Sequence, residues 1–286
     1  MSAYATPAAF REALERRLLD RARQTDTNLE RLRRRVVFER LLVRLERAEP
    51  GRWILKGGMA LEVRLGEASR MTRDLDLVVR AEGEGGDALR ERLSVALGSD
   101  PDGDRFVFAV GEPSSLAAVQ EGDAGWRYAV DVTLAERLFG RVSIDVVPRV
   151  SEVAATERIG LPDMLGFAGI PTTDIEVVER TQHFAEKLHA LTRDYGAPNS
   201  RVRDLVDLVI LVDDGLEPTA ELYRVIAHVF ETRGTHPIPS ELPDPPAAWV
   251  DDFATRAKSL DISARTLDAA MTVLRAFWAR VREDAA

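Results

Sequence analysis

Hydrophobic and polar positions change their spacing near the middle of the chain. Apolar residues at three- and four-residue intervals predict two amphipathic helices, over about residues 7–24 and 28–48. Short apolar or alternating runs then predict strands at 53–55, 75–79, about 105–110, 127–134 and 141–148. Helical patterns lie between them at 59–65 and in a segment that ends near residue 97. The last two strands are so close in sequence that we expect a hairpin or a neighbouring pair.

Strand patterns largely disappear after Pro148, and helical patterns replace them. They cover about 178–194, 200–213, 217–232, 247–258 and 262–282, with a proline-rich segment before the last two. We therefore expect an α+β protein with two domains. Residues 1–150 would form a mixed domain, and residues 151–286 a mainly helical one.

The composition excludes several classes of protein. The chain of 286 residues has 39 basic and 48 acidic side chains, a net charge of −9 and 45% hydrophobic residues, which is an ordinary globular balance. It has no cysteine, which excludes disulfides, thiolate zinc sites and cysteine nucleophiles. No apolar run reaches the length of a membrane span, and the first ten residues lack a secretory-signal pattern. We expect a cytoplasmic protein with no membrane partner.

The N-terminal segment is basic although the whole chain is acidic. Residues 11–47 contain 12 arginines and 7 acidic residues. This pattern is typical of a surface that binds nucleic acid, or of solvated helices with internal ion pairs such as Glu12 with Arg16. The charges alone favour the second interpretation.

Asp74 and Asp76 stand two residues apart in a predicted strand. Because alternate side chains of a strand share a face, the two carboxylates lie ~7 Å apart and can converge on one or two divalent cations. A third acid, Asp145, interrupts the apolar run Val142–Val147 on its other face and needs a partner there. A metal ion shared with Asp74 and Asp76 could be that partner. An arginine partner, or exposure on the sheet face, is the alternative.

Gly57 and Gly58 stand at a predicted strand-to-helix junction. Paired glycines allow backbone amides to approach a phosphate, and a helix N-terminus favours negative charge, although such a pair is also typical of a simple turn. Magnesium on strand carboxylates, with a glycine turn for a triphosphate, is the arrangement that nucleotidyl transfer needs. The chain lacks a GxxxxGK[ST] loop and the protein-kinase signatures, which argues against those two enzyme classes.

Two residues of the helical half are candidates for the same chemistry. Lys187 is one of only three lysines, and its compact ammonium suits a triphosphate, although a surface lysine is the alternative. Asp207 lies in an apolar run and needs a buried partner, for which Lys187, Arg203 or a substrate hydroxyl are the candidates. We favour Asp207 over Asp204, because an acid near a helix start, such as Asp204, can act simply as a cap.

Four motifs in this order resemble the AbiEii family of toxin nucleotidyltransferases, which includes the MenT-type toxins. They are LKGGMAL at 55–61, TRDLD at 72–76, EKLHAL at 186–191 and RDLVDL at 203–208. The resemblance covers about residues 52–213. Met59 departs from the pattern, since family members often carry Ser or Thr there, and a hydroxyl contact to phosphate is therefore missing.

The resemblance implies a DNA polymerase β-like nucleotidyltransferase core with a helical C-terminal part. It implies transfer of nucleotides from a magnesium-bound NTP to tRNA 3′ acceptor ends, which stops translation, and a cognate antitoxin as partner. The basic N-terminal helices would then bind RNA. The implied site residues are Asp74, Asp76, Lys187 and Asp207 for catalysis, Lys56, Gly57, Gly58, Met59 and Lys187 for the nucleotide, and Asp74, Asp76 and Asp145 for the metal.

Two other functions stay open at this point. One is nucleotidyl transfer to a protein or small-molecule hydroxyl. The other is a non-catalytic module that binds a nucleotide or a partner through a degenerate site. The second is disfavoured because all the charged residues that the chemistry needs are present.

Overall fold

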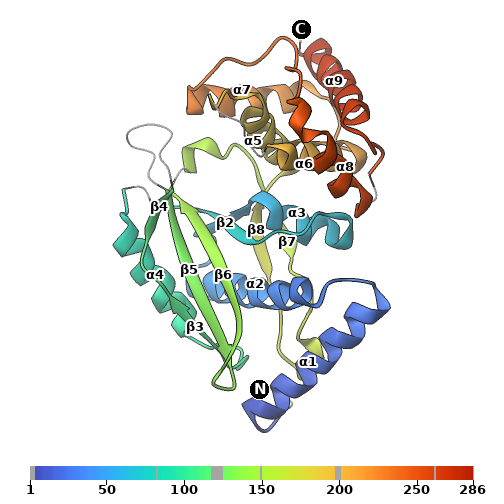
Figure 1. Cartoon of the computed structure of the whole chain (residues 1–286). Helices are drawn as coiled ribbons and strands as arrows, with labels where there is room; N and C mark the ends of the chain where they lie inside the picture. The colour runs from blue at the N-terminus through green and yellow to red at the C-terminus, as the bar shows by residue number, and fades with distance from the viewer. Residues whose placement is uncertain are drawn as a thin grey trace. The chain divides into compact units, whose positions relative to one another are not determined.

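The chain forms two compact units whose segments interleave along the sequence (Figure 1). The computed structural model describes residues 4–81, 83–116, 125–148, 150–196, 201–260 and 262–285. Unit 1 contains Met1–Met59, Met71–Val150 and Arg158–Val177, and unit 2 contains Ala60–Arg70, Ser151–Glu157 and Val178–Ala286. The two domains predicted to meet near residue 150 stay a prediction.

The strands form one mixed sheet in the order β3-β5-β6-β2-β1-β8-β7, with β4 paired to β5 outside this path. Two pairs, β1 with β8 and β2 with β6, are parallel, and β5 and β6 form the expected hairpin. The α+β class is confirmed. The strands are β1 (Trp53–Lys56), β2 (Asp74–Val79), β3 (Phe106–Val110), β4 (Ser114–Leu116), β5 (Gly125–Leu134), β6 (Arg137–Val147), β7 (Thr156–Gly160) and β8 (Asp174–Val178).

Two of these strands, β7 and β8, follow Pro148, where the sequence pattern predicted little but helices. In β8 only Ile175 and Val177 alternate as buried residues before the helical pattern begins, and β7 has no fully buried side chain. Five-residue strands with so little apolar surface leave a weak periodic signal. Their place in the sheet comes from pairing, with β8 lying parallel to β1.

The central strands of the sheet have one apolar and one polar face. Leu75, Leu77 and Ile144 are buried on the apolar face. The hydroxyl of Tyr128 on this face donates to the carbonyl of Gly86 at 2.8 Å, so α4 (Gly86–Gly98) lies against it. Helix α2 (Leu29–Ala48) contacts β6 and α4, and α1 (Pro7–Gln24) contacts α2 and β5. Figure 1 shows α4 alongside β3 and β5.

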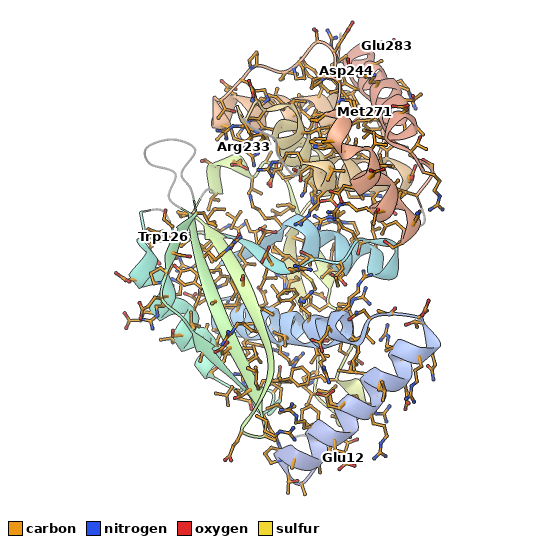
Figure 2. All side chains as sticks on the ribbon, viewed as in Figure 1. Glu12, Trp126, Arg233, Asp244, Met271 and Glu283 are labelled. Carbon is orange, nitrogen blue, oxygen red and sulfur yellow. The ribbon has the colours of Figure 1, made fainter. Side chains whose placement is uncertain are left out.

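Gly86 is a point of very close packing between α4 and β5. A Cβ added to Gly86 would lie 2.7 Å from the ring of Trp126, which stands at the start of β5 (Figure 2). Any larger residue at position 86 would therefore displace the helix or the ring.

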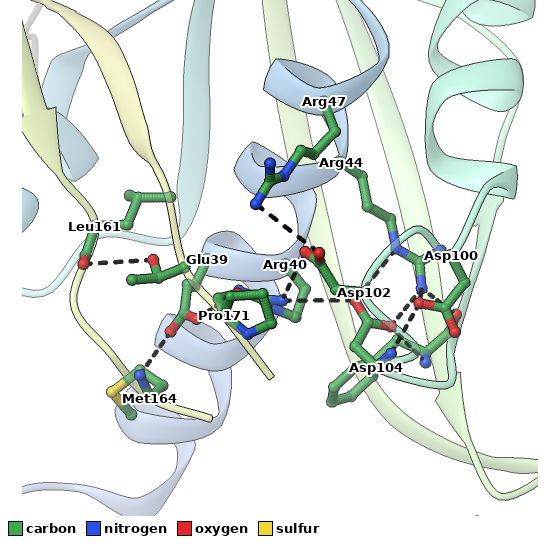
Figure 3. Close-up of polar contacts among 12 residues, drawn as sticks. Glu39, Arg40, Arg44, Arg47, Asp100, Asp102, Asp104, Leu161, Met164 and Pro171 are labelled. Atoms are coloured by element: carbon green, nitrogen blue, oxygen red, sulfur yellow. Dashed lines mark hydrogen bonds and ion pairs between the residues drawn. The ribbon is translucent and has the colours of Figure 1, made fainter. Parts of the chain in front are cut away.

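Helix α2 buries charged side chains as well as apolar ones. The guanidinium of Arg44 donates to the carboxylate of Asp104 (Figure 3). It also donates to the carbonyls of Leu97 at 2.6 Å and Phe106 at 2.8 Å. Arg40, also fully buried, donates to Glu39 at 2.7 Å. These arginines belong to the basic segment found in the sequence, so part of its positive charge is neutralised inside unit 1.

Unit 2 is built around helices, and the five predicted after residue 178 are all present. They pack on a core that includes Phe184, Leu188, Leu205 and Phe253. Helix α3 (Gly57–Leu65) adds Leu61 to this core. The five are α5 (Arg180–Thr192), α6 (Val202–Asp213), α7 (Ala220–Arg233), α8 (Val250–Lys258) and α9 (Leu267–Asp284). Within the described residues, no helix has the length and apolar character needed to cross a membrane.

Candidate active site

Asp74 and Asp76 lie on the polar face of β2 in unit 1, as the alternation predicted. Both side chains are partly exposed, whereas Leu75 and Leu77 are buried on the opposite face. Carboxylate oxygens are the ligands that Mg²⁺ prefers, and it commonly uses one or two of them with waters and phosphates. Among the described residues no three His, Cys, Asp or Glu side chains converge on one point. Asp74 and Asp76 are the two carboxylates that β2 offers on this face.

Four charged residues form a row across the polar face. Asp76 is in register with Lys56 on β1 and with Asp145 on β6, and Asp145 is in register with Arg127 on β5. Residues directly opposite each other on neighbouring strands project from the same face. We call Lys56, Asp76, Asp145 and Arg127 the charge row. It places two carboxylates side by side with a cationic residue at each end.

Asp145 has an arginine partner, which is one of the two alternatives that its apolar strand left open. Arg127 donates from Nε to Oδ1 and from Nη2 to Oδ2 of Asp145, each at 2.7 Å. These hydrogen bonds raise the pKa of Arg127 against the opposing effect of burial, and the charges of Asp145, Asp74 and Asp76 raise it further. Arg127 therefore stays protonated and positively charged beside the acids. A metal-ligand role for Asp145 stays a prediction.

Gly57 lets the backbone pass directly over the Asp76 carboxylate. Its φ is +65°, and a Cβ built on it would lie 2.0 Å from Oδ2 of Asp76. Only glycine fits such a position, for both reasons. The expected glycine turn therefore exists at the start of α3, beside the acids. Met59, two residues on, is 2% exposed, which leaves its backbone for any nucleotide contact.

A second group of charges lies in unit 2 around Lys187. Its Nζ is 2.8 Å from Oδ1 of Asp204 and 2.9 Å from Oδ2 of Asp207. Arg70 donates to both oxygens of Asp207, at 2.6 and 2.8 Å, and Arg201 lies 3.3 Å from Asp204. We call these five residues the Lys187 cluster. Its three cations exceed its two carboxylates by one charge.

Burial and pairing act in opposite directions in the Lys187 cluster. Burial favours the neutral form of Asp207, but the charges of Lys187 and Arg70 dominate and hold its pKa well below the ordinary range. Burial also lowers the pKa of Lys187, and the charges of Asp207 and Asp204 more than offset this, so its pKa lies above the ordinary value. Lys187 and Asp207 are therefore both ionised at neutral pH.

The partners of Asp207 are only partly those that the sequence suggested. Lys187 was one of three candidates, whereas Arg203 is exposed. Arg70 was not foreseen, because it lies 137 positions from Asp207 and no local pattern links them. Lys187 contacts Asp204 as closely as Asp207, so the preference for Asp207 as the functional acid stays a prediction.

The structure groups the predicted residues within each unit. Lys56, the glycine turn and the strand acids belong to unit 1, and the Lys187 cluster belongs to unit 2. Arg127 is the residue of unit 1 that the sequence analysis missed. Counting residues from the turn, where Leu134 pairs with Arg137, would have placed Arg127 opposite Ile144. A register shift at Val132 and Thr133 brings it opposite Asp145 instead, and the sequence alone does not reveal that shift.

The fold is similar to that of a solved structure. The chain is similar to MenT4, a nucleotidyltransferase toxin from Mycobacterium tuberculosis, with a TM-score of 0.58 and 19% identity over 98% of this chain and 90% of that one. A putative nucleotidyltransferase from H. pylori aligns with a TM-score of 0.43 and 13% identity, covering 88% of this chain and 93% of that one. A nucleotidyltransferase-like antigen from Paracoccidioides brasiliensis gives 0.40 and 16%, over 72% and 89%. No curated protein sequence matches.

Comparison of the sequence with protein families identifies the family of this chain. Residues 40–279 match the family described as nucleotidyl transferase AbiEii toxin, type IV toxin–antitoxin system. The chain therefore belongs to the AbiEii family of nucleotidyltransferase toxins, as its motifs predicted. Membership implies an NTP substrate and an antitoxin partner.

Proposed function

We propose that this toxin transfers nucleotides from a magnesium-bound NTP to the 3′ acceptor ends of tRNA and so blocks translation. The observation that carries the proposal is the pair of carboxylates on one face of β2, with the Gly57 turn held against one of them. Magnesium bound there would gather the triphosphate, activate the attacking hydroxyl and stabilise the leaving pyrophosphate.

The protein residues have separate tasks in this proposal. Asp74 and Asp76 supply oxygen ligands from a rigid strand, and Gly57 leaves room for the Asp76 carboxylate. Lys187 contacts phosphate oxygens through an ammonium that Asp204 and Asp207 keep charged and fixed in place. Asp207 acts as a positioning residue, because its carboxylate is fully buried and binds both Lys187 and Arg70.

The acceptor is proposed from the family resemblance and from the surface of α1. Arg16, Arg17, Arg21 and Arg23 are exposed on this helix, where phosphates can reach them, although Arg16 forms the expected ion pair with Glu12 at 3.0 Å. The arginines of α2 contribute less than the sequence suggested, since Arg35, Arg40 and Arg44 are buried. The RNA contact is therefore assigned mainly to α1.

The burial of these α2 arginines favours one alternative function, which is nucleotidyl transfer to a protein or small-molecule hydroxyl. A smaller acceptor would not need a long basic surface. The alternative predicts pyrophosphate release without label on RNA.

The test is incubation of purified protein with total tRNA, Mg²⁺ and each labelled NTP in turn. We expect label on tRNA 3′ ends from the wild type, and a rate at least about 100-fold lower from Asp76→Asn, because charge stabilisation in the transition state is lost. Asp131→Asn is the matched control. Asp131 is an acid of β5 in the same sheet, paired with Arg141 of β6, and its substitution should leave labelling intact. Equal labelling by wild type and Asp76→Asn would refute the proposed site.

A further inference from the structure

Arg127 and Asp145 form a bidentate salt bridge beside the proposed metal ligands. Both carboxylate oxygens of Asp145 accept from the guanidinium in a bidentate arrangement, which is the strong geometry for this pair. The Asp145 side chain is 13% exposed, whereas that of Arg127 is 46% exposed. A carboxylate held in this way, with a positive charge beside it, is a poor ligand for a divalent cation.

The charges on this face favour one ion. Asp74, Asp76 and Asp145 contribute three negative charges, and Lys56 and Arg127 contribute two positive ones. These five residues together carry a net charge of −1. One divalent cation on Asp74 and Asp76 changes this to +1. A second would raise it to +3 next to a fixed guanidinium, which Coulomb repulsion opposes.

We propose that Arg127 is a positioning residue that occupies the place of a second cation, so that the site binds one divalent metal ion through Asp74 and Asp76, and Asp145 is not a ligand. The inference rests on the proposed function, because it concerns the same metal site. According to this proposal, Arg127 determines whether the site binds one metal ion or two.

The experiment counts Mn²⁺ bound by the full-length protein, from the electron paramagnetic resonance signal of free Mn²⁺ and from calorimetry. We expect one Mn²⁺ per chain for the wild type, and none for Asp76→Asn. Arg127→Met should bind a second ion, or bind Mn²⁺ at least about tenfold tighter, because a like charge is removed and two oxygens are released. Asp145→Asn alone should bind Mn²⁺ as the wild type does.

Three further variants make the result specific. Arg141→Met removes a paired contact of the same kind, to Asp131, on the same two strands, and should leave Mn²⁺ binding unchanged. Arg127→Lys keeps the positive charge and should still bind one ion. Arg127→Met combined with Asp145→Asn should return the site to one ion.

Two results would overturn the inference alone. One is two Mn²⁺ in the wild type and a single Mn²⁺ in Asp145→Asn. The other is an Arg127→Met variant that binds one ion with wild-type affinity. A wild type that binds no Mn²⁺ would instead reject the metal-dependent function and this inference together. Should Arg127→Met fail to fold, Asp145→Asn still decides, because reduced Mn²⁺ binding in that variant contradicts the proposal.

Discussion

Buried charges in this protein are stable where a second element supplies the partner. Asp207 on α6 is fully buried and binds Lys187 of α5 and Arg70, which follows α3. His183, one turn before Lys187, is the contrasting case. It is 1% exposed, and neither ring nitrogen has a hydrogen-bond partner among the described residues. Burial, followed by the charge of Lys187, lowers its pKa to about 3.

The state of His183 predicts how stability depends on pH. Between pH 7 and 5 the unfolded chain binds a proton on this ring and the folded chain does not, so the free energy of unfolding falls by about 2 kcal/mol as the pH falls. Burial also lowers the pKa of His189 to about 3, which adds a second contribution of the same sign. We therefore expect His183→Met to reduce the fall in the free energy of unfolding between pH 7 and pH 5 by about 2 kcal/mol. Urea unfolding at pH 7 and pH 5 measures it, and an unchanged pH dependence would show that the pKa of His183 is the same in the folded and unfolded chains.

At the scale of elements, α2 joins the rest of unit 1 through charge as well as apolar contact. Arg44 connects this helix to the end of α4, through Leu97, and to the start of β3, through Phe106. Its carboxylate partner, Asp104, is 1% exposed and depends on it for neutralisation. The sequence pattern of α2 is typical of a basic surface helix, but the buried arginines of α2 bind other elements of unit 1.

Removal of Arg44 should consequently destabilise the fold. Arg44→Met removes the cation that donates to the buried Asp104 carboxylate and leaves it the guanidinium of Arg40 at 3.9 Å, and should lower the free energy of unfolding by about 3–5 kcal/mol. Arg47→Met, at a position further along α2, removes an exposed arginine whose Nη2 is 3.9 Å from Asp102, and should cost less than about 1 kcal/mol. Chemical denaturation of the two variants compares them. A similar decrease in both would mean that the Arg44 contacts contribute little.

For the whole molecule, the arginines of the basic N-terminal segment fall into two groups, one buried and one exposed. Several arginines of α2, including Arg40 and Arg44, face the interior, while those of α1 are largely exposed. The net charge of −9 disfavours nucleic acid in general, so the proposed RNA binding would depend on a local surface.

This division predicts which arginines RNA binding requires. Arg16→Glu with Arg23→Glu on α1 should weaken tRNA binding, and should reduce the slope of log affinity against log salt by about 0.7–0.9 for each phosphate that is no longer neutralised. The matched control is Arg224→Glu with Arg280→Glu, two exposed positions on α7 and α9, which makes the same change in net charge. Mn²⁺ binding should be normal in both. Equal weakening by the two pairs would indicate a general charge effect and no RNA surface on α1.

Local periodicity accounts for most of the elements that the sequence predicted correctly. Helices α1, α2 and α5–α9 each repeat an apolar face over several turns, and β5 and β6 alternate over ten or more residues. The short strands β7 and β8 were missed because their place depends on pairing with other strands. The Arg127–Asp145 and Arg70–Asp207 contacts required a register or a long-range approach that no local pattern contains.

Motif order and periodicity were enough to establish the family, the α+β class and the candidate acids and lysine, because these are properties of neighbouring residues. Which charges pair was settled by packing in three dimensions. The fold placed Arg127 on Asp145, closed Gly57 over Asp76 and gave Lys187 two carboxylates. This is so because the energy of a charge depends on its burial and on partners within a few ångströms, and both are set by contacts between elements distant in the sequence.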